Sequence, residues 1–414
     1  MKLNYKLLGQ YIRQIDVRND SGSEVNLLGV STQKKFIDSI ANTIGTNFKK
    51  YKVIKKNQFA YVPDTSRRGD KIGIAMLLDR DEAIVSQAYT VFEIIDENLL
   101  NPEYLMMWFS RVEFDRYARY MSHGSVREIF SWEDMCNVKL PVPSIEKQRE
   151  IVKDYNTILN RIQLNENMIE KLEDLLQSLY RQWFVDFEYP DESGNSYKSS
   201  GGAMTYCHQL DNKIPTGWKF GIFEDLELDI SDGNYSSKYP KNEEFKSSGV
   251  PFIRGVDFNN KFIDPNNLIF ITEEKHLSLT KGHTKKDDIL ITTRGASIGK
   301  YAYITDRFIN ANINSQLVRV NGNGKIPSVF LGCLFNDNFF KEMLNAQITG
   351  SAQPQLSIAN LMKINIIIPD NNVLQEFSRR YTIILEMIKI KSDEKFVLQD
   401  FSKILLTNLS SVGE

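Results

Sequence analysis

The most regular hydrophobic pattern in this chain lies between residues 146 and 187. Counted from Ser144 as the N-cap, steps of four and three residues meet an apolar side chain at nine of ten positions. This spacing predicts a coiled-coil helix. Asn165 is the polar exception, which either fixes the helix register at a cost in stability or lies at a locally open part of the seam. The ten seam positions are Ile151, Tyr155, Ile158, Ile162, Asn165, Ile169, Leu172, Leu176, Leu179 and Trp183.

A second long amphipathic helix is predicted at the end of the chain, where two possible seams compete. One contains Phe377, Tyr381, Ile384, Ile388, Lys391, Lys395, Leu398, Ser402, Leu405 and Leu409, and the other contains Ile383, Met387, Ile390, Val397, Phe401 and Ile404. Two helices of similar length in one chain most simply pair antiparallel, with one seam buried against the other. The remaining apolar faces are then expected to be available to partner subunits.

The chain contains an internal repeat at an offset of 226 residues. The motif R-G-x-x-I-G, interpreted as a tight turn between strands, occurs at residues 68–73 and again at 294–299. The same offset relates Gly124-Ser125 to Gly350-Ser351, Ser131 to Ser357, Pro143 to Pro369 and Glu150 to Glu376. Because one shift satisfies so many separated positions, the chain is interpreted as a duplication.

Each copy has the same predicted order of elements. Strand-rich runs come first, at 52–61, 84–95, 289–293 and 317–320. A short extended segment follows at 138–143 and at 364–369, and its proline closes the strand because it cannot donate to a ladder. A long helix comes last, and the polar, turn-rich residues 190–202 form a linker between the copies. The expected fold class is α+β: two tandem mixed α/β domains, separated by two long antiparallel coiled-coil helices, in a pseudo-two-fold repeat.

The composition is that of a globular protein with two or three domains, at 414 residues, 42% hydrophobic and 25% charged. No apolar run approaches the roughly 18 residues of a membrane span, and the first residues lack the apolar core of a signal peptide. A cytoplasmic location is therefore expected. The three cysteines and four histidines show neither a disulfide framework nor zinc-ligand spacing, so no metal is expected.

The charge distribution leaves DNA binding open. The net charge is −2, whereas phosphate contacts need Lys and Arg. Residues 1–145 carry 20 basic and 18 acidic side chains, and residues 215–369 carry 17 and 16. Near-neutral domains of this kind can bind DNA if their basic residues gather on one face, or if a partner supplies the phosphate contacts.

Motifs for catalysis are absent or incomplete. An adenine methyltransferase needs Asn/Asp-Pro-Pro-aromatic, and none of the twelve prolines adjoins another. Residues 295–300 are like a phosphate-binding loop, but one residue is missing between the glycines and Tyr301 replaces the Ser/Thr that holds magnesium. Two loose nuclease-like matches, at 190–213 and 369–395, are short enough to recur by chance. The chain is therefore predicted to be non-catalytic.

Several motifs together resemble the specificity (S) subunit of type I restriction–modification systems, over nearly the whole chain. The most specific is the run 197–204 (Tyr-Lys-Ser-Ser-Gly-Gly-Ala-Met) followed by Ile-Pro-Thr-Gly-Trp at 214–218, which is typical of the segment between the two domains of this family. Other matching runs are 124–127 and 141–149 in the first copy, and 288–291, 294–300, 313–317 and 350–357 in the second.

The resemblance implies target-recognition domains at 1–143 and 214–369, spacer helices at 144–189 and 370–414, and a linker at 190–213. Each domain would read one half of a bipartite target in double-stranded DNA. The helices would set the spacing and dock two methylation (M) subunits, and restriction/translocase (R) subunits would complete the complex. No cofactor is expected in this chain, because S-adenosylmethionine, ATP and Mg would be held by the partner subunits.

The residues that read bases are expected in turn-rich stretches, where Arg can bind guanine and Gln adenine in the major groove. A solvated or structural role is an equal alternative for each, and the arginines of R-G-x-x-I-G could hold the turn itself. The candidates are Arg67, Arg68, Lys71, Ser125 and Arg127 in the first domain, and Ser236, Lys238, Arg254, Arg294, Lys300, Gln353 and Gln355 in the second.

Two other functions stay open at this point. A specificity subunit of a methylation-only complex would have the same sequence features, and neighbouring genes would distinguish it. A coiled-coil scaffold that never reads DNA is disfavoured, because the two copies differ greatly outside their shared turns, as two readers of different half-sites would.

Overall fold

The computed structural model describes residues 5–22, 24–31, 33–39, 47–65, 71–123, 128–235, 237–350 and 353–411. The chain forms two compact units, residues 1–163 with 397–414 and residues 164–396. None of the described helices combines the length and the apolar character needed to cross a membrane. Five candidate DNA-contacting residues, Arg67, Arg68, Ser125, Arg127 and Ser236, lie outside the described residues.

The first unit is built on two four-stranded sheets. One has the order β2-β9-β6-β7 and the other β4-β3-β8-β5, and the pair β1–β10 stands apart. The strands are β1 Tyr5–Leu7, β2 Ile12–Ile15, β3 Leu27–Val30, β4 Phe36–Asp38, β5 Lys52–Lys55, β6 Phe59–Tyr61, β7 Ile74–Met76, β8 Glu82–Val85, β9 Thr90–Ile94 and β10 Lys139–Pro141. The helices α1 (Pro102–Phe109), α2 (Val112–Met121) and α3 (Trp132–Cys136) precede β10. The predicted run 52–61 is two strands, because Asn57 turns the chain with a φ of 66°.

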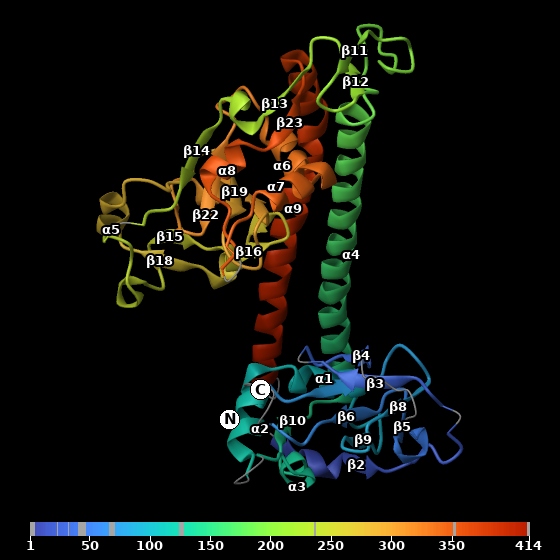
Figure 1. Cartoon of the computed structure of the whole chain (residues 1–414). Helices are drawn as coiled ribbons and strands as arrows, with labels where there is room; N and C mark the ends of the chain where they lie inside the picture. Colours follow the sequence, from blue (N-terminus) through green and yellow to red (C-terminus); the bar gives the residue numbers. More distant parts are fainter. Residues whose placement is uncertain are drawn as a thin grey trace. The chain divides into compact units, whose positions relative to one another are not determined.

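The second unit contains a four-stranded sheet β14-β22-β19-β20, a three-stranded sheet β18-β15-β21 and the pair β13–β23 (Figure 1). The strands are β13 Lys219–Ile222, β14 Asp229–Asp232, β15 Val250–Ile253, β18 Ile269–Ile271, β19 Ile289–Thr292, β20 Tyr301–Tyr303, β21 Asn312–Ile313, β22 Leu317–Asn321 and β23 Asn365–Ile368, with a small hairpin of β16 (Phe258–Asn259) and β17 (Phe262–Ile263). The helices are α5 Glu273–Ser278, α6 Ser328–Asn336, α7 Asn338–Ala346 and α8 Ile358–Met362.

The topology confirms the duplication. The orders β2-β9-β6-β7 and β14-β22-β19-β20 correspond strand for strand, and β3–β8 and β15–β21 are the equivalent parallel pairs. The offset of 226 carries the starts of α1, α2, α3 and β10 onto those of α6, α7, α8 and β23. The repeated serines Ser131 and Ser357 are N-caps, since each side chain accepts a hydrogen bond from a first-turn backbone N–H of α3 or α8.

Two long helices follow the two copies, α4 at Ile145–Phe184 and α9 at Asn371–Asn408. Ser144 caps α4, as predicted, with its Oγ accepting from the backbone N–H of Lys147 at 3.4 Å. The helix ends at Phe184 and does not continue to residue 187, because Phe187 has a φ of 63° and packs its ring edge-on against Trp218 at 5.6 Å.

The helices run antiparallel in the second unit. The Trp183 ring near the end of α4 lies 5.5 Å from that of Phe377 near the start of α9, and Glu166 lies 3.9 Å from Lys395 further along. All ten seam positions predicted for the first helix are buried or half-buried.

On α9 the seam that begins at Phe377 is the buried one. All of its ten positions are buried or half-buried, whereas the six apolar side chains of the competing seam are 41–68% exposed.

The segment 190–213, predicted as a linker, contains ordered structure. Strands β11 (Met204–Cys207) and β12 (Asn212–Pro215) form an antiparallel hairpin. The Trp218 ring that follows stacks on Tyr189 at 5.3 Å and is 6% exposed, so aromatic packing holds the end of this segment. The boundaries proposed for the recognition domains remain predictions.

Candidate nucleic-acid interface

The second R-G-x-x-I-G motif forms a tight turn between β19 and β20, as predicted. Gly295 and Gly299 have φ angles of 80° and 86°, which side chains with a Cβ rarely adopt. The backbone N–H of Thr292 donates to the carbonyl of Lys300 at 2.8 Å, and the Thr292 hydroxyl donates to the carbonyl of Ser297. The turn is therefore closed on itself, and its first residue, Arg294, is half-buried.

A second loop, between α7 and α8, pairs with this turn. The Gly295 N–H donates to the carbonyl of Pro354 at 3.1 Å, and Arg294 forms a β-bridge with Gln355. Gly350 closes the loop with a φ of 87°, and a Cβ at this position would lie 2.7 Å from the carbonyl oxygen of Gln353. The structure thus brings together two motifs that the internal repeat had marked separately, and it places Arg294 beside Gln355.

Tyr235 and Lys281 join this site, and sequence reasoning had missed both. The guanidinium of Arg294 lies 4.9 Å from the centre of the Tyr235 ring, and the Lys281 ammonium lies 5.3 Å from it. Lys281 also forms an ion pair with Asp232. The sequence feature that could have pointed to Tyr235 is its position in a turn-rich stretch, next to the candidate Ser236. Such a ring favours nearby cations, but nothing in the sequence shows which cations reach it.

These residues border a cavity of about 280 Å³ that is open to the surface. Six of its lining residues carry polar groups, Asp232, Tyr235, Thr293, Arg294, Gln355 and Ser357, and Val318, Leu356 and Ile358 complete the lining. An aromatic ring, a guanidinium and an amide on three different loops are suited to contact a base edge or a phosphate. We name this group of residues the Arg294 site.

Among the other candidates of the second domain, Arg254 is already engaged by a carboxylate. The guanidinium of Arg254 is held by the buried carboxylate of Asp257, at 2.7 and 3.2 Å, within a short 3-10 turn. Arg254 therefore ranks below Arg294 as a DNA contact. Lys238, Lys300 and Gln353 are exposed.

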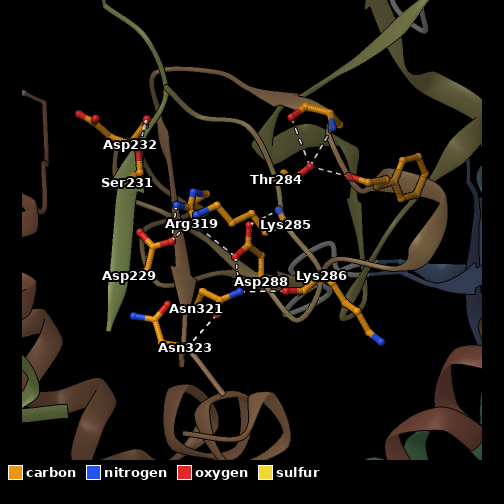
Figure 2. Close-up of polar contacts among 12 residues, drawn as sticks. Asp229, Ser231, Asp232, Thr284, Lys285, Lys286, Asp288, Arg319, Asn321 and Asn323 are labelled. Carbon is orange, nitrogen blue, oxygen red and sulfur yellow. Dashed lines mark hydrogen bonds and ion pairs between the residues drawn. The ribbon is translucent and has the colours of Figure 1, made fainter. Parts of the chain in front are cut away.

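Beneath the loops, the central strands are held by a buried ionic network (Figure 2). Arg319 on β22 donates to Asp288 at 3.2 Å and to Asp229 on β14 at 2.7 Å. Asp288 also accepts from the Asn321 amide at 2.8 Å and from the Lys285 backbone N–H at 2.6 Å. Burial raises the pKa of Asp288 above its usual value, although these hydrogen bonds oppose the shift. Because Arg319 is neutralised inside the sheet, it is a scaffold residue and no DNA contact.

In the first unit, the described part of the equivalent turn is anchored differently. The backbone N–H of Ile72 donates to Asp115 at 3.1 Å, and Lys34 forms a buried ion pair with the same carboxylate at 2.7 Å. The Lys34 ammonium also donates to the carbonyl of Phe109 at 2.5 Å. Lys71, one residue before this anchor, is exposed. The carboxylate thus connects the turn to α2.

Among the described residues, no group of three or more His, Cys, Asp and Glu side chains could hold a metal ion.

Comparison with known proteins relates this architecture to one family. The family of type I restriction modification DNA specificity domains matches residues 15–174 and 228–394. The type I restriction enzyme MjaIX specificity subunit of Methanocaldococcus jannaschii is 25% identical over 317 residues, which cover 76% of this chain and 70% of that protein. The type I restriction enzyme HindI specificity subunit of Haemophilus influenzae is 22% identical over 462 residues, with 97% of both chains covered.

Solved structures support the same fold. The crystal structure of the type I restriction–modification system S subunit from M. genitalium superposes with a TM-score of 0.57 at 14% sequence identity, covering 99% of this chain and 96% of that one. The two matched segments correspond to the two copies of the repeat, each with part of its long helix. The chain therefore belongs to the family of type I restriction modification DNA specificity domains and contains two such domains.

Proposed function

We propose that this chain is the DNA-reading specificity subunit of a type I restriction–modification complex, in which each domain reads one half of a bipartite target in double-stranded DNA. The observation that carries the proposal is a conserved scaffold with different loops. The two central sheets have the same strand order, and a loop pairs with each in the same way, through the bridges Asp64–Ile129 in the first copy and Arg294–Gln355 in the second. The residues at these bridges differ in charge and polarity between the copies. A common scaffold with divergent polar loops is what two readers of different sequences require.

The helices are proposed to set the spacing between the two half-sites. The 40 residues of α4 correspond to roughly 60 Å at about 1.5 Å per residue. With a rise of about 3.4 Å per base pair, this length matches one to two turns of duplex. A buried seam along the helix favours a rigid rod over a flexible linker.

The same helices are proposed to dock two methylation subunits. On α9, six large apolar side chains are exposed at helical spacing: Ile383, Met387, Ile390, Val397, Phe401 and Ile404. A stripe of exposed apolar side chains is unfavourable in water and marks an interaction surface. An amphipathic helix of a partner is the element that fits such a stripe. Electrostatic contacts to phosphates would then be shared with the partner, which accounts for the near-neutral charge of this chain.

The chemistry of the complex is proposed to lie outside this chain. S-adenosylmethionine would be bound by the methylation subunits, and ATP and Mg by the restriction/translocase subunits. Relatives of this chain are named as specificity subunits of restriction enzymes, and its sequence lacks the Asn/Asp-Pro-Pro-aromatic motif of an adenine methyltransferase.

The test is co-expression with the methylation subunits, followed by mapping of N6-methyladenine in the host DNA. We expect one split motif, and we expect exchange of residues 214–369 for those of a relative to change one half of it only. The exchange of an unrelated surface residue, Arg13→Lys, serves as the control and should leave both halves intact. A stable complex without any methylation would instead favour a scaffold that does not read DNA. Methylation without cleavage in the presence of all neighbouring genes would identify a methylation-only system.

A further inference from the structure

The arginines of the second domain differ in how their charge is compensated. Arg319 is paired with two carboxylates inside the sheet, and Arg254 is paired with Asp257. Arg294 has no ion pair with any carboxylate of the described chain, and its guanidinium rests against the ring of Tyr235. A half-buried guanidinium without an anionic partner keeps its hydrogen-bond donors available for a ligand.

Both ends of the Arg294 side chain are held in place. Its backbone is fixed by the β-bridge to Gln355 and by the bond from the Gly295 N–H to Pro354. Its guanidinium lies 4.9 Å from the centre of the Tyr235 ring, and the Tyr235 hydroxyl donates to the carbonyl of Ser315 at 2.5 Å. The tyrosine is therefore tied to the loop before β22, although it is 45% exposed.

This arrangement favours base reading over a simple phosphate contact. A phosphate attracts any nearby cation, and a mobile lysine serves that purpose well. Holding a planar guanidinium in one orientation is useful where two donors must meet two acceptors at once, as in the bidentate contact of arginine with O6 and N7 of guanine. Lys281 lies on the same ring and pairs with Asp232, so it balances the negative charge of that carboxylate near the site.

We infer that Arg294 reads a guanine through its major-groove edge in the half-site of the second domain, with Tyr235 as the positioning residue that orients it. This inference rests on the proposed function and names the base class and the residues for one position of the target. It predicts that the half-site lost on exchange of residues 214–369 contains a guanine whose N7 and O6 are both required.

The test uses the full chain with its methylation subunits and duplexes that contain the mapped target. Each guanine of the second half-site is replaced in turn by 7-deazaguanine, which lacks the N7 acceptor. Inosine, which keeps N7 and O6, is the matched base control. At one position we expect 7-deazaguanine to weaken binding to the unchanged protein by about 5- to 150-fold, while inosine has little effect.

The protein variants Arg294→Lys and Tyr235→Leu then locate the contact. Arg294→Lys keeps the charge but loses the fork, so it should abolish the discrimination at that single position and leave the dependence of binding on salt unchanged. Tyr235→Leu should reduce the same discrimination, and Arg13→Lys in the first domain should change nothing. Because Tyr235 and Arg294 lie at the surface, both variants are expected to fold, and circular dichroism verifies this.

Two results would overturn the inference. If Arg294→Ala weakens binding equally for all sequences and lowers the salt slope by about one, Arg294 contacts a phosphate. If 7-deazaguanine has the same effect on the unchanged protein and on Arg294→Ala, another residue reads that base. In both cases the split motif persists, whereas failure of the proposed function would abolish sequence-specific binding and methylation altogether.

Discussion

Removal of the buried cation Arg319 should destabilise the second unit strongly. In Arg319→Met the packing volume is largely kept, but Asp288 loses its ionic partner while it remains fully buried. Asp229 keeps the Lys285 ammonium at 2.8 Å, so the uncompensated charge is that of Asp288. Breaking one partner of a buried pair costs about 3–5 kcal/mol. We therefore expect the free energy of unfolding of the second unit to fall by about this amount.

The first unit provides a control in the equivalent pair of strands, β2 and β9. Arg13 on β2 pairs with Glu93 on β9 at 2.6 Å, but the Arg13 side chain is 62% exposed. Glu93 also keeps a hydrogen bond from Gln58 at 2.7 Å. An exposed pair contributes about 0.2–1 kcal/mol, so Arg13→Met should cost at most this amount. Comparison of Arg319→Met with Arg13→Met thus separates the effect of burying an ion pair from the effect of removing a positive charge.

The destabilisation of Arg319→Met should also depend on pH. Burial raises the pKa of Asp288, and loss of the arginine removes one interaction that opposes this rise. A carboxyl group with a raised pKa in the folded state contributes stability at low pH, and this contribution is lost as the pH rises through that pKa. The variant should therefore be closer to the unchanged protein in stability at about pH 5 than at about pH 8.

Hydrogen–deuterium exchange is the appropriate assay, because it reports opening free energies for separate regions of a protein with two units. The amides of β14, β19 and β22 should exchange faster in Arg319→Met, whereas those of β2, β6 and β9 should change little in Arg13→Met. Equal effects of the two substitutions, or a larger effect at Arg13, would refute the reasoning from burial. A destabilisation that does not diminish at acid pH would refute the assignment of the cost to Asp288.

Three further predictions concern other parts of the chain. Asn165 is fully buried, and both polar atoms of its side-chain amide are unpaired within the described chain. Asn165→Leu should therefore raise the free energy of unfolding by about 1–3 kcal/mol in urea titrations. Asn160 is exposed, so Asn160→Leu should not raise it. Asp115→Asn removes the partner of a buried lysine and should lower the stability of the first unit by about 3 kcal/mol or more, measured by hydrogen exchange of α2. Ile390→Glu, on the exposed stripe of α9, should leave the free energy of unfolding unchanged but abolish copurification of the methylation subunits. The buried Ile388→Glu should instead unfold the helix pair. If the methylation subunits still copurify with Ile390→Glu, they do not dock at this stripe.

Local sequence patterns predicted the two long helices, several strands and the duplication, but not the short helices that precede β10 and β23. The offset of 226 residues relates the starts of α1, α2, α3 and α4 to those of α6, α7, α8 and α9, because capping serines, prolines and turn glycines act on the backbone nearest to them. Ser131 and Ser357 are the clearest example, since their repetition is explained by a cap that each makes within its own short helix. The seam of the first helix was likewise visible, because its period is set within a single element.

The tertiary structure decided which surfaces face each other. Two seams on α9 have similar apolar character, and only packing shows that Phe377 is buried while Ile390 is exposed. At the Arg294 site, too, the sequence identified some residues and only the tertiary structure identified the others. Arg294 and Gln355 were recognised as candidates from their type and position, but Tyr235 and Lys281 lie about 60 and 13 residues from Arg294 in the sequence and meet it only in the fold.

The physical reason is the range of the interactions involved. Helix periodicity, caps and turn glycines depend on neighbours within a few residues, so the sequence alone determined the long helices, the repeated turns and the duplication. Burial of an ion pair such as Arg319–Asp288, or stacking of a guanidinium on a ring, depends on strands and loops that are distant in the chain. These contacts exist only once the sheets have formed, and therefore only the tertiary structure could distinguish the buried, paired Arg319 from Arg294, for which we propose the reading role.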